Sequence, residues 1–177
     1  MSETVIILHN IRSCLNVGAI LRTAEGFGVS RVVFSGYTPR YEDERELPHL
    51  REKLNHQIEK TALGAEKYVT REVSEDIRET LTELKREEHV IVGLENNLSD
   101  ERKMEATLEN VPRLREKLGG RKVALILGEE VHGIPAELYD LIEVFLEIPM
   151  EGKKESFNVS VATGVGLFFL NEVCGKI

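Results

Sequence analysis

The chain has 177 residues, 41% of them hydrophobic and 31% charged, and this length and composition favour a single soluble globular domain. No apolar run approaches the ~20 residues of a membrane span, and the first residues lack the basic region of a signal peptide, so we expect a cytoplasmic protein. A formal net charge of −8 argues against a protein that coats nucleic acid non-specifically, because phosphate neutralisation needs a basic surface.

Short aliphatic runs alternate with segments of helical period along the whole chain. In chain order we predict a strand at 5–8, a helix at 16–27, a strand at 31–34, a helix at 50–63, a strand at 67–70, a helix at 74–87, a strand at 90–94, a helix at 111–118, a strand at 123–127, a helix at 135–141, a strand at 144–148 and a helix at 159–173. This alternation predicts an α/β fold with an open, mainly parallel sheet of about six strands and helices on both faces.

Ligands of open parallel sheets bind beyond the carboxyl ends of the strands, so the loops that follow strands should carry the chemistry. Three such loops have informative sequences: 9–16, 128–133 and 149–158. The strand-poor segment 37–60 is rich in both charge signs and is the candidate for a mobile or partner-binding insertion.

A second charged region, 113–122, holds five cations and one acidic residue, Glu116. These cations fit either a solvated helix end, where they complement the helix dipole, or a surface for phosphate groups, and we favour the helix end. Lys153 and Lys154 offer a similar choice between solubility and phosphate contact.

Several familiar sites are missing from the sequence. The loop after the first strand lacks the GxGxxG pattern of dinucleotide-binding enzymes, which argues against a Rossmann-like nucleotide enzyme, and residues 128–133 carry two glutamates where a P-loop needs backbone donors and a lysine. The two cysteines, Cys14 and Cys174, and the five histidines have no metal-ligand spacing, so we expect neither a metal site nor a disulfide framework.

Three motifs in series resemble the SpoU (TrmH-like) branch of the SPOUT methyltransferases. Residues 16–24 read NVGAILRTA and are followed by Gly28, 125–134 read LILGEEVHGI, and 148–162 contain IPM followed by SFNVSVA. The resemblance extends along nearly the whole chain and places each motif at the end of a predicted strand. A single such motif is weak, but three in this order make coincidence improbable.

This resemblance implies a fold with a deep C-terminal trefoil knot, formed by threading the last helix through a loop, which is a rare exception to the rule that chains avoid knots. Gly164 and Gly166 would then allow close backbone approach within that helix. It also implies one SPOUT domain over 1–177 without a separate N-terminal RNA-binding domain, and a homodimer with its sites near the subunit interface.

The resemblance further implies an S-adenosyl-L-methionine-dependent RNA 2′-O-ribose methyltransferase that needs no metal, and the size of the chain suggests tRNA as substrate. The cofactor-binding residues would be Leu94, Gly128, Ile148, Met150, Ser156 and Phe157. Main-chain groups at the strand ends Leu94 and Ile148 would suit an adenine edge, and Gly128 would allow the cofactor to approach closely.

The catalytic residues implied in the same way are Arg22, Asn16, Glu130, Ser156 and Asn158. Arg22 would activate the 2′-hydroxyl. An arginine is a poor proton acceptor, so orientation of the phosphate and stabilisation of the developing alkoxide are physically easier than base catalysis, although Arg22 could instead brace the site by pairing with Glu130. We expect Glu130 to pair with Asn16 or Arg22.

Helix capping offers a structural explanation for three of these residues. Asn16, Ser156 and Asn158 precede or open predicted helices, where their side chains could serve as N-caps. A non-catalytic RNA-binding or assembly protein with the same knotted fold is the alternative function. It predicts the loss of at least one motif residue, and none is lost in this sequence.

Overall fold

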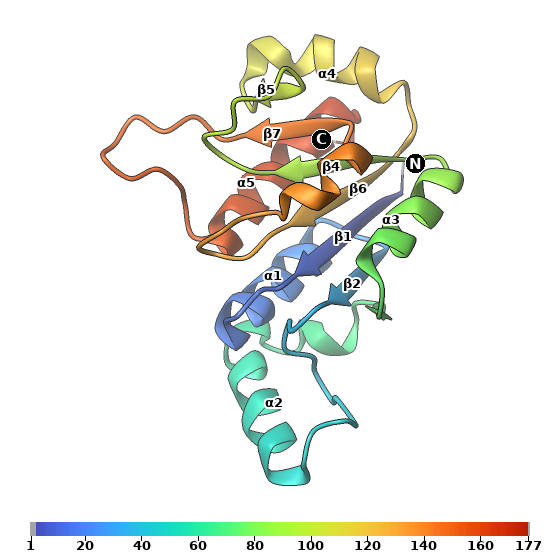
Figure 1. Cartoon of the computed structure of the whole chain (residues 1–177). Coiled ribbons are helices and arrows are strands. Elements are labelled where there is room, and N and C mark those ends of the chain that lie inside the picture. The colour runs from blue at the N-terminus through green and yellow to red at the C-terminus, as the bar shows by residue number, and fades with distance from the viewer. Residues whose placement is uncertain (1–2, 177) are drawn as a thin grey trace.

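The computed structural model describes residues 3–176, which fold around a single seven-stranded sheet (Figure 1). Its strands are β1 (Thr4–His9), β2 (Arg31–Ser35), β3 (Arg71–Ser74), β4 (His89–Leu94), β5 (Lys103–Glu105), β6 (Lys122–Leu127) and β7 (Val144–Glu147). Every strand pair in the order β3-β2-β1-β6-β4-β7-β5 is parallel, which confirms the predicted parallel α/β sheet.

Two strands differ from the sequence prediction. The strand predicted at 67–70 lies further along as β3, because residues Ala65–Lys67 form a 3-10 helix, η1, after a left-handed Gly64. The short edge strand β5 was not predicted, since it has three residues and buries only Met104, too little for an alternating pattern.

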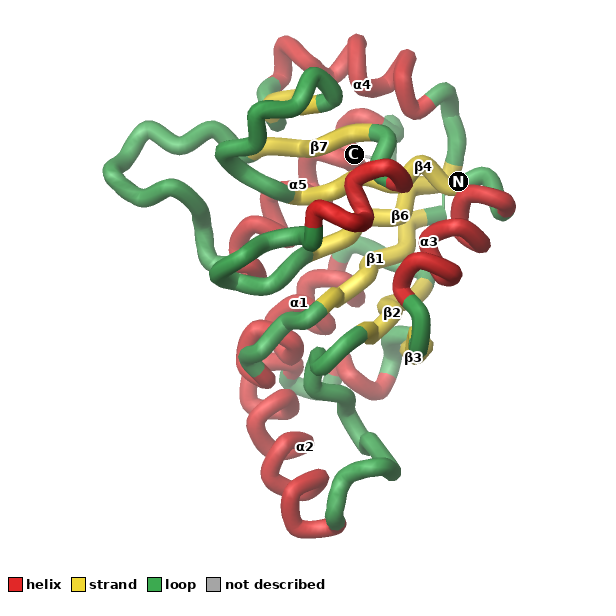
Figure 2. The backbone as a smooth tube through the Cα atoms, viewed as in Figure 1, coloured by secondary structure: helices red, strands yellow, loops and turns green. Residues whose placement is uncertain are grey.

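Helices cover both faces of the sheet, as predicted (Figures 1 and 2). They are α1 (Cys14–Gly26), α2 (Pro48–Ala62), α3 (Ile77–Arg86), α4 (Val111–Leu118) and α5 (Val159–Val173). The segment predicted as a helix at 135–141 is a 3-10 helix, η3 (Ala136–Leu141), and a third short 3-10 helix, η2, spans Leu108–Asn110.

Alternate residues of the five central strands, β2, β1, β6, β4 and β7, point into two separate cores. In β1, Ile6 and Leu8 pack with α1, α4 and α5, whereas Val5 and Ile7 pack with α3 and η3. This period of two, with both faces apolar, is what a sheet buried on both sides requires.

The N-terminal ends of α1 and α5 lie close together at the carboxyl edge of the sheet. Asn158 caps α5 by accepting the Ser160 N–H at 2.9 Å, in agreement with its capping prediction. α1 begins two residues before the predicted start, because the Ser13 hydroxyl rather than Asn16 is the N-cap, accepting the Asn16 N–H at 3.3 Å.

The C-terminal part of the chain crosses the sheet in an unusual order. β7 inserts between β4 and β5, and a long loop then leads to α5, which packs beside α1. Figure 2 shows this loop extending away from the sheet. The threading of α5 through a knot stays a prediction. None of the helices within residues 3–176 combines the length and apolar character needed to cross a bilayer.

The two charged regions have structural roles in the fold. The second half of the 37–60 segment is helix α2, which buries Ile58 and Ala62 against the core. In the 113–122 region, Arg115 donates to the carbonyls of Glu172 and Val173 at the end of α5, at 2.9 and 2.8 Å, and Arg121 pairs with Glu143 at 3.1 Å. These contacts support the helix-end interpretation of that region.

Candidate functional site

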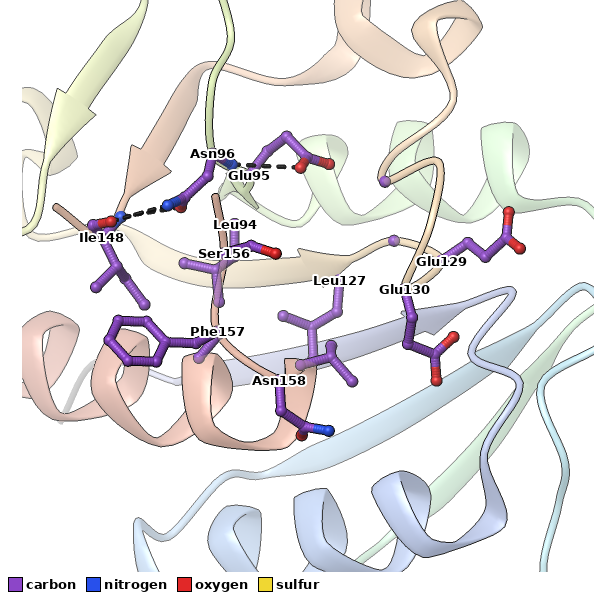
Figure 3. A pocket seen from close by; sticks show the side chains of 14 residues that line it. Leu94, Glu95, Asn96, Leu127, Glu129, Glu130, Ile148, Ser156, Phe157 and Asn158 are labelled. Carbon is purple, nitrogen blue, oxygen red and sulfur yellow. Dashed lines mark hydrogen bonds between the residues drawn. The ribbon is translucent and has the colours of Figure 1, made fainter. Parts of the chain in front are cut away.

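A pocket of about 160 Å³ opens at the carboxyl ends of β4, β6 and β7 (Figure 3). Its wall is made by the loops after these strands and by the first turn of α5. Of the six residues predicted to bind the cofactor, five line this pocket: Leu94, Gly128, Ile148, Ser156 and Phe157. Met150 is not among its lining residues. The loops after Leu127 and Ile148 therefore meet in one pocket, whereas no described residue of the loop after Leu8 is among its lining residues.

The lining side chains are acidic and apolar. Glu95, Glu129 and Glu130 contribute carboxylates, and among the described residues that line the pocket there is no lysine or arginine. Burial raises the pKa of Glu95, although N–H groups of Ile134 and Asn96 donate to its carboxylate at 2.8 and 3.3 Å. Such a lining suits an uncharged or cationic ligand better than a phosphate.

Gly128 is required by the turn that follows it. A Cβ on Gly128 would overlap the backbone of Gly133 and Ile134. The turn is closed by the Glu129 N–H donating to the Gly133 carbonyl at 3.1 Å and by the reverse bond at 2.9 Å. We expected this glycine to make room for a ligand, but the close approach that excludes a side chain comes from the chain itself.

Glu130 joins this turn to the start of α1. Its carboxylate accepts the backbone N–H groups of Arg12 and Ser13 at 3.1 and 3.3 Å and the Asn16 amide at 3.0 Å. Burial opposes ionisation of this group, but the hydrogen bonds hold the pKa of Glu130 below its ordinary value. The predicted contact between Glu130 and Asn16 is present.

A second link connects α1 to α5. The Asn158 amide donates to the Asn16 side-chain oxygen at 3.2 Å, so Glu130, Asn16 and Asn158 form one hydrogen-bonded chain across three elements. Ser156 lies in the pocket wall and does not cap α5. The structure thus brings four of the five predicted catalytic residues to one edge of the sheet.

Arg22 stands apart from this network. It is exposed on α1, does not line the pocket, and within residues 3–176 makes no side-chain hydrogen bond or ion pair. The alternative in which Arg22 braces the site by pairing with Glu130 is therefore wrong for this structure. Its guanidinium is free to meet a group from outside the chain.

Two pocket residues were missed from the sequence, Glu95 and Asn96. The Asn96 side chain accepts the Ile148 N–H at 3.2 Å and donates to the Ile148 carbonyl at 2.8 Å (Figure 3). The main-chain groups of Ile148 that we expected to suit an adenine edge are thus already bonded to a side-chain amide. The signal for both residues was their position directly after a predicted strand at the same sheet edge.

Comparison with known proteins supports a specific family. The model of the SpoU rRNA Methylase family matches residues 3–168. An uncharacterized tRNA/rRNA methyltransferase of Borreliella burgdorferi is 30% identical over 164 residues, which are 93% of this chain and 61% of that protein. A putative TrmH family tRNA/rRNA methyltransferase of Staphylococcus aureus is 28% identical over 94% of this chain and 57% of its own length. The chain thus spans about three fifths of these relatives.

Solved structures show the same fold. The A. aeolicus TrmH/SpoU tRNA modifying enzyme superimposes with a TM-score of 0.74 at 22% identity, over 99% of this chain and 77% of that one. The AdoMet-bound rRNA methyltransferase of Sinorhizobium meliloti gives a TM-score of 0.73 at 22% identity, over 96% of this chain and 56% of that one. At this identity the likeness establishes the architecture alone.

Proposed function

Because the chain belongs to the SpoU rRNA methylase family, we propose that it is an S-adenosyl-L-methionine-dependent RNA methyltransferase that modifies a ribose 2′-hydroxyl. We further propose tRNA as the substrate and the cytoplasm as its location. The observation that carries the proposal is the acidic and apolar pocket beside the chain of hydrogen bonds from Glu130 to Asn158.

The residues that line the pocket suit the chemistry of the cofactor. S-adenosylmethionine carries a sulfonium cation, an ammonium group and one carboxylate, and the described residues that line the pocket include Glu95 and Glu130 but no lysine or arginine. The third lining glutamate, Glu129, is already paired with Arg12 and His132. Leu94, Ile148 and Phe157 offer apolar surface for the adenosyl part. When bound, the cofactor supplies an activated methyl group, and the protein must orient the reactants and handle one proton.

We assign the work on the RNA to α1 and its neighbours. The developing alkoxide of the 2′-hydroxyl needs a positive partner, and the unpaired, exposed Arg22 is our candidate for that role and for orienting a phosphate. Glu130 has all three of its hydrogen bonds directed at α1 and the loop before it. Its role is therefore to position Asn16 and the helix start.

We also propose that the working unit is a homodimer formed through α5. Val161, Val165 and Phe168 lie at helical spacing on its outer face and are 50%, 38% and 57% exposed. Gly164 lies in the same part of the helix. A Cβ placed on it would meet only the Thr23 methyl group, at the ordinary contact distance of 3.8 Å. Contacts within one chain therefore do not explain why this position is glycine, and the missing side chain leaves space for a second copy of the chain.

Two measurements test the enzyme proposal. Calorimetric titration of the purified protein should show binding of S-adenosylmethionine, and incubation with total RNA and methyl-labelled cofactor should label one class of RNA at a ribose. Cofactor binding without transfer to any RNA would favour a non-catalytic RNA-binding protein. Absence of binding at millimolar cofactor would reject the enzyme.

A further inference from the structure

Three planar side chains lie exposed near the start of α1, and none of them has a role in the function proposed above. Arg12 follows β1, Tyr37 follows β2 and His132 follows β6, so they come from three separate loops at the carboxyl edge of the sheet. The side chains of Arg12 and His132 are 59% and 76% exposed, and Tyr37 is 54% exposed.

One carboxylate holds Arg12 and His132 together. Glu129, whose side chain is only 11% exposed, forms an ion pair with Arg12 and pairs with His132 Nδ1 at 2.7 Å. Hydrogen bonding to Tyr37 and the charge of Glu129 raise the pKa of Arg12, and the bond to His132 is the main cause that lowers the pKa of Glu129. The orientation of the Arg12 guanidinium and of the His132 ring is thus set by a buried partner.

The backbone around Tyr37 is fixed in a similar way. Its N–H donates to the Asn10 side chain at 3.3 Å, and Asn10 in turn bonds to His9, which contacts Ser35 at 2.8 Å. The turn that carries His132 is closed by the paired backbone bonds between Glu129 and Gly133. These loops therefore present Tyr37 and His132 from a rigid frame.

The group also lies next to the proposed catalytic network. The Arg12 N–H donates to Glu130, the same carboxylate that holds Asn16. Figure 3 shows Glu129 pointing away from Phe157 and Ile148, while Glu130 lies toward Asn158. Arg12 and Asn16 are thus bonded to the same carboxylate, which places the group beside that network.

An exposed ion pair by itself contributes little to stability, so fold stability does not explain why three planar groups are held in place here. Unpaired nucleobases stack on aromatic rings and on arginine guanidinium planes, and stacking contributes to affinity without base-specific hydrogen bonds. A platform of these groups next to a ribose-modifying site would hold a base that has left its helix.

We propose that Arg12 and His132, both paired with Glu129, form together with Tyr37 a platform on which a nucleobase stacks beside the ribose that is methylated. This inference rests on the proposed function, because it assumes an RNA substrate. The platform acts on binding and positioning of the RNA and not on the cofactor, since none of its three planar side chains lines the pocket.

The test compares alanine and aromatic replacements. Tyr37→Ala and His132→Ala should each weaken binding of fluorescently labelled tRNA about tenfold, measured by anisotropy, and raise KM for RNA with little change in kcat. Tyr37→Phe keeps the ring and should bind more tightly than Tyr37→Ala. His132→Phe keeps a ring but loses the bond to Glu129, so it should recover only part of the affinity that His132→Ala loses. Arg12→Lys keeps the charge without the plane and should also lose affinity. Tyr68→Ala is the matched control, because Tyr68 is 80% exposed just before β3, at the other edge of the sheet.

The outcomes separate this inference from the proposed function. Unchanged tRNA affinity in both alanine variants overturns the platform, whether or not the wild-type protein methylates RNA. The wild-type protein could bind tRNA and transfer no methyl group to any RNA, which would overturn the enzyme proposal. Weaker tRNA binding by the alanine variants of that protein would still support the platform. A wild-type protein that binds no tRNA overturns the platform and the proposed tRNA substrate, while the cofactor titration and the labelling of total RNA still decide the enzyme proposal.

Discussion

At the scale of single residues, the site depends on a few side chains whose partners are far away in the sequence. Glu130 accepts three hydrogen bonds from the segment that begins α1, and Asn96 satisfies both main-chain groups of Ile148. In contrast, Arg22 has no partner within residues 3–176. The first two residues hold the site in shape, and Arg22 is available for the substrate.

Replacement of Arg22 by alanine tests whether this residue acts on the substrate rather than on the shape of the site. Because Arg22 is exposed and does not line the pocket, Arg22→Ala should keep the cofactor affinity and the melting temperature of the wild type. Loss of an electrostatic stabiliser of the alkoxide should lower kcat about 100-fold or more. Calorimetry and a methyl-transfer assay measure the two effects, and an equal loss of cofactor binding would show that Arg22 is structural.

Replacement of Asn96 by alanine should destabilise the protein. It removes both bonds to the main chain of Ile148, which is 6% exposed, so the free energy of unfolding should fall by about 1–3 kcal/mol. The control is Asn97→Gly, which removes an amide bonded to Glu155 and suits the left-handed φ of 61° at that position. Chemical denaturation should show a loss for Asn96→Ala alone.

The lowered pKa of Glu130 gives a pH dependence with a definite sign. A carboxylate whose pKa is lower in the folded protein stabilises the fold above its unfolded pKa of about 4.5, and this stabilisation is lost as the pH falls through the lower folded value. Glu130→Gln should flatten the stability profile in this acidic range, measured by thermal melts from pH 3 to 7. At neutral pH it should lower methyl transfer about 10- to 100-fold through misplacement of Asn16. A profile identical to that of the wild type would contradict this account.

At the scale of elements, the contact between α1 and α2 explains a glycine of the first motif. A Cβ on Gly18 would overlap the Ile58 carbonyl and the Thr61 hydroxyl of α2. The Thr61 hydroxyl also donates to the Leu15 carbonyl at 2.8 Å. The motif glycine therefore permits close helix packing, which ties the 37–60 segment to the helix that carries Asn16 and Arg22.

Gly18→Ala should consequently destabilise the protein by about 1–3 kcal/mol, because backbone atoms of α2 would have to move. Gly26→Ala, in the same helix, meets no atom within 4 Å and should leave stability unchanged or raise it by up to about 1 kcal/mol. Thermal melts of the two variants make the comparison. Equal stability of both would show that α2 does not pack as described.

At the scale of the whole molecule, two features bear on how the protein would meet RNA: the acidic net charge of −8 and the exposed apolar stripe on α5. A dimer through α5 would bury Val161, Val165 and Phe168. It would also bring the RNA-facing groups of two chains together on one surface, where their local charges rather than the acidic net charge meet the RNA.

Phe168→Glu tests the dimer, because Phe168 is 57% exposed and its replacement should not disturb the fold of one chain. Light scattering after gel filtration should give twice the chain mass for the wild type and the single chain mass for the variant. Leu108→Glu, at a residue 78% exposed on η2, is the control and should remain dimeric. A monomeric wild type would overturn the dimer proposal.

The sequence by itself determined the parallel α/β sheet, the extents of α4 and α5 and the position of the three motifs. These features depend on local patterns, because apolar periodicity and cap chemistry act within a few residues. Only the tertiary structure decided why Gly18 and Gly128 must be glycine, that Asn96 occupies the main chain of Ile148, and that Arg22 lies apart from Glu130. Each of these depends on contacts between segments distant in the chain, and such contacts exist only after the sheet and helices have packed.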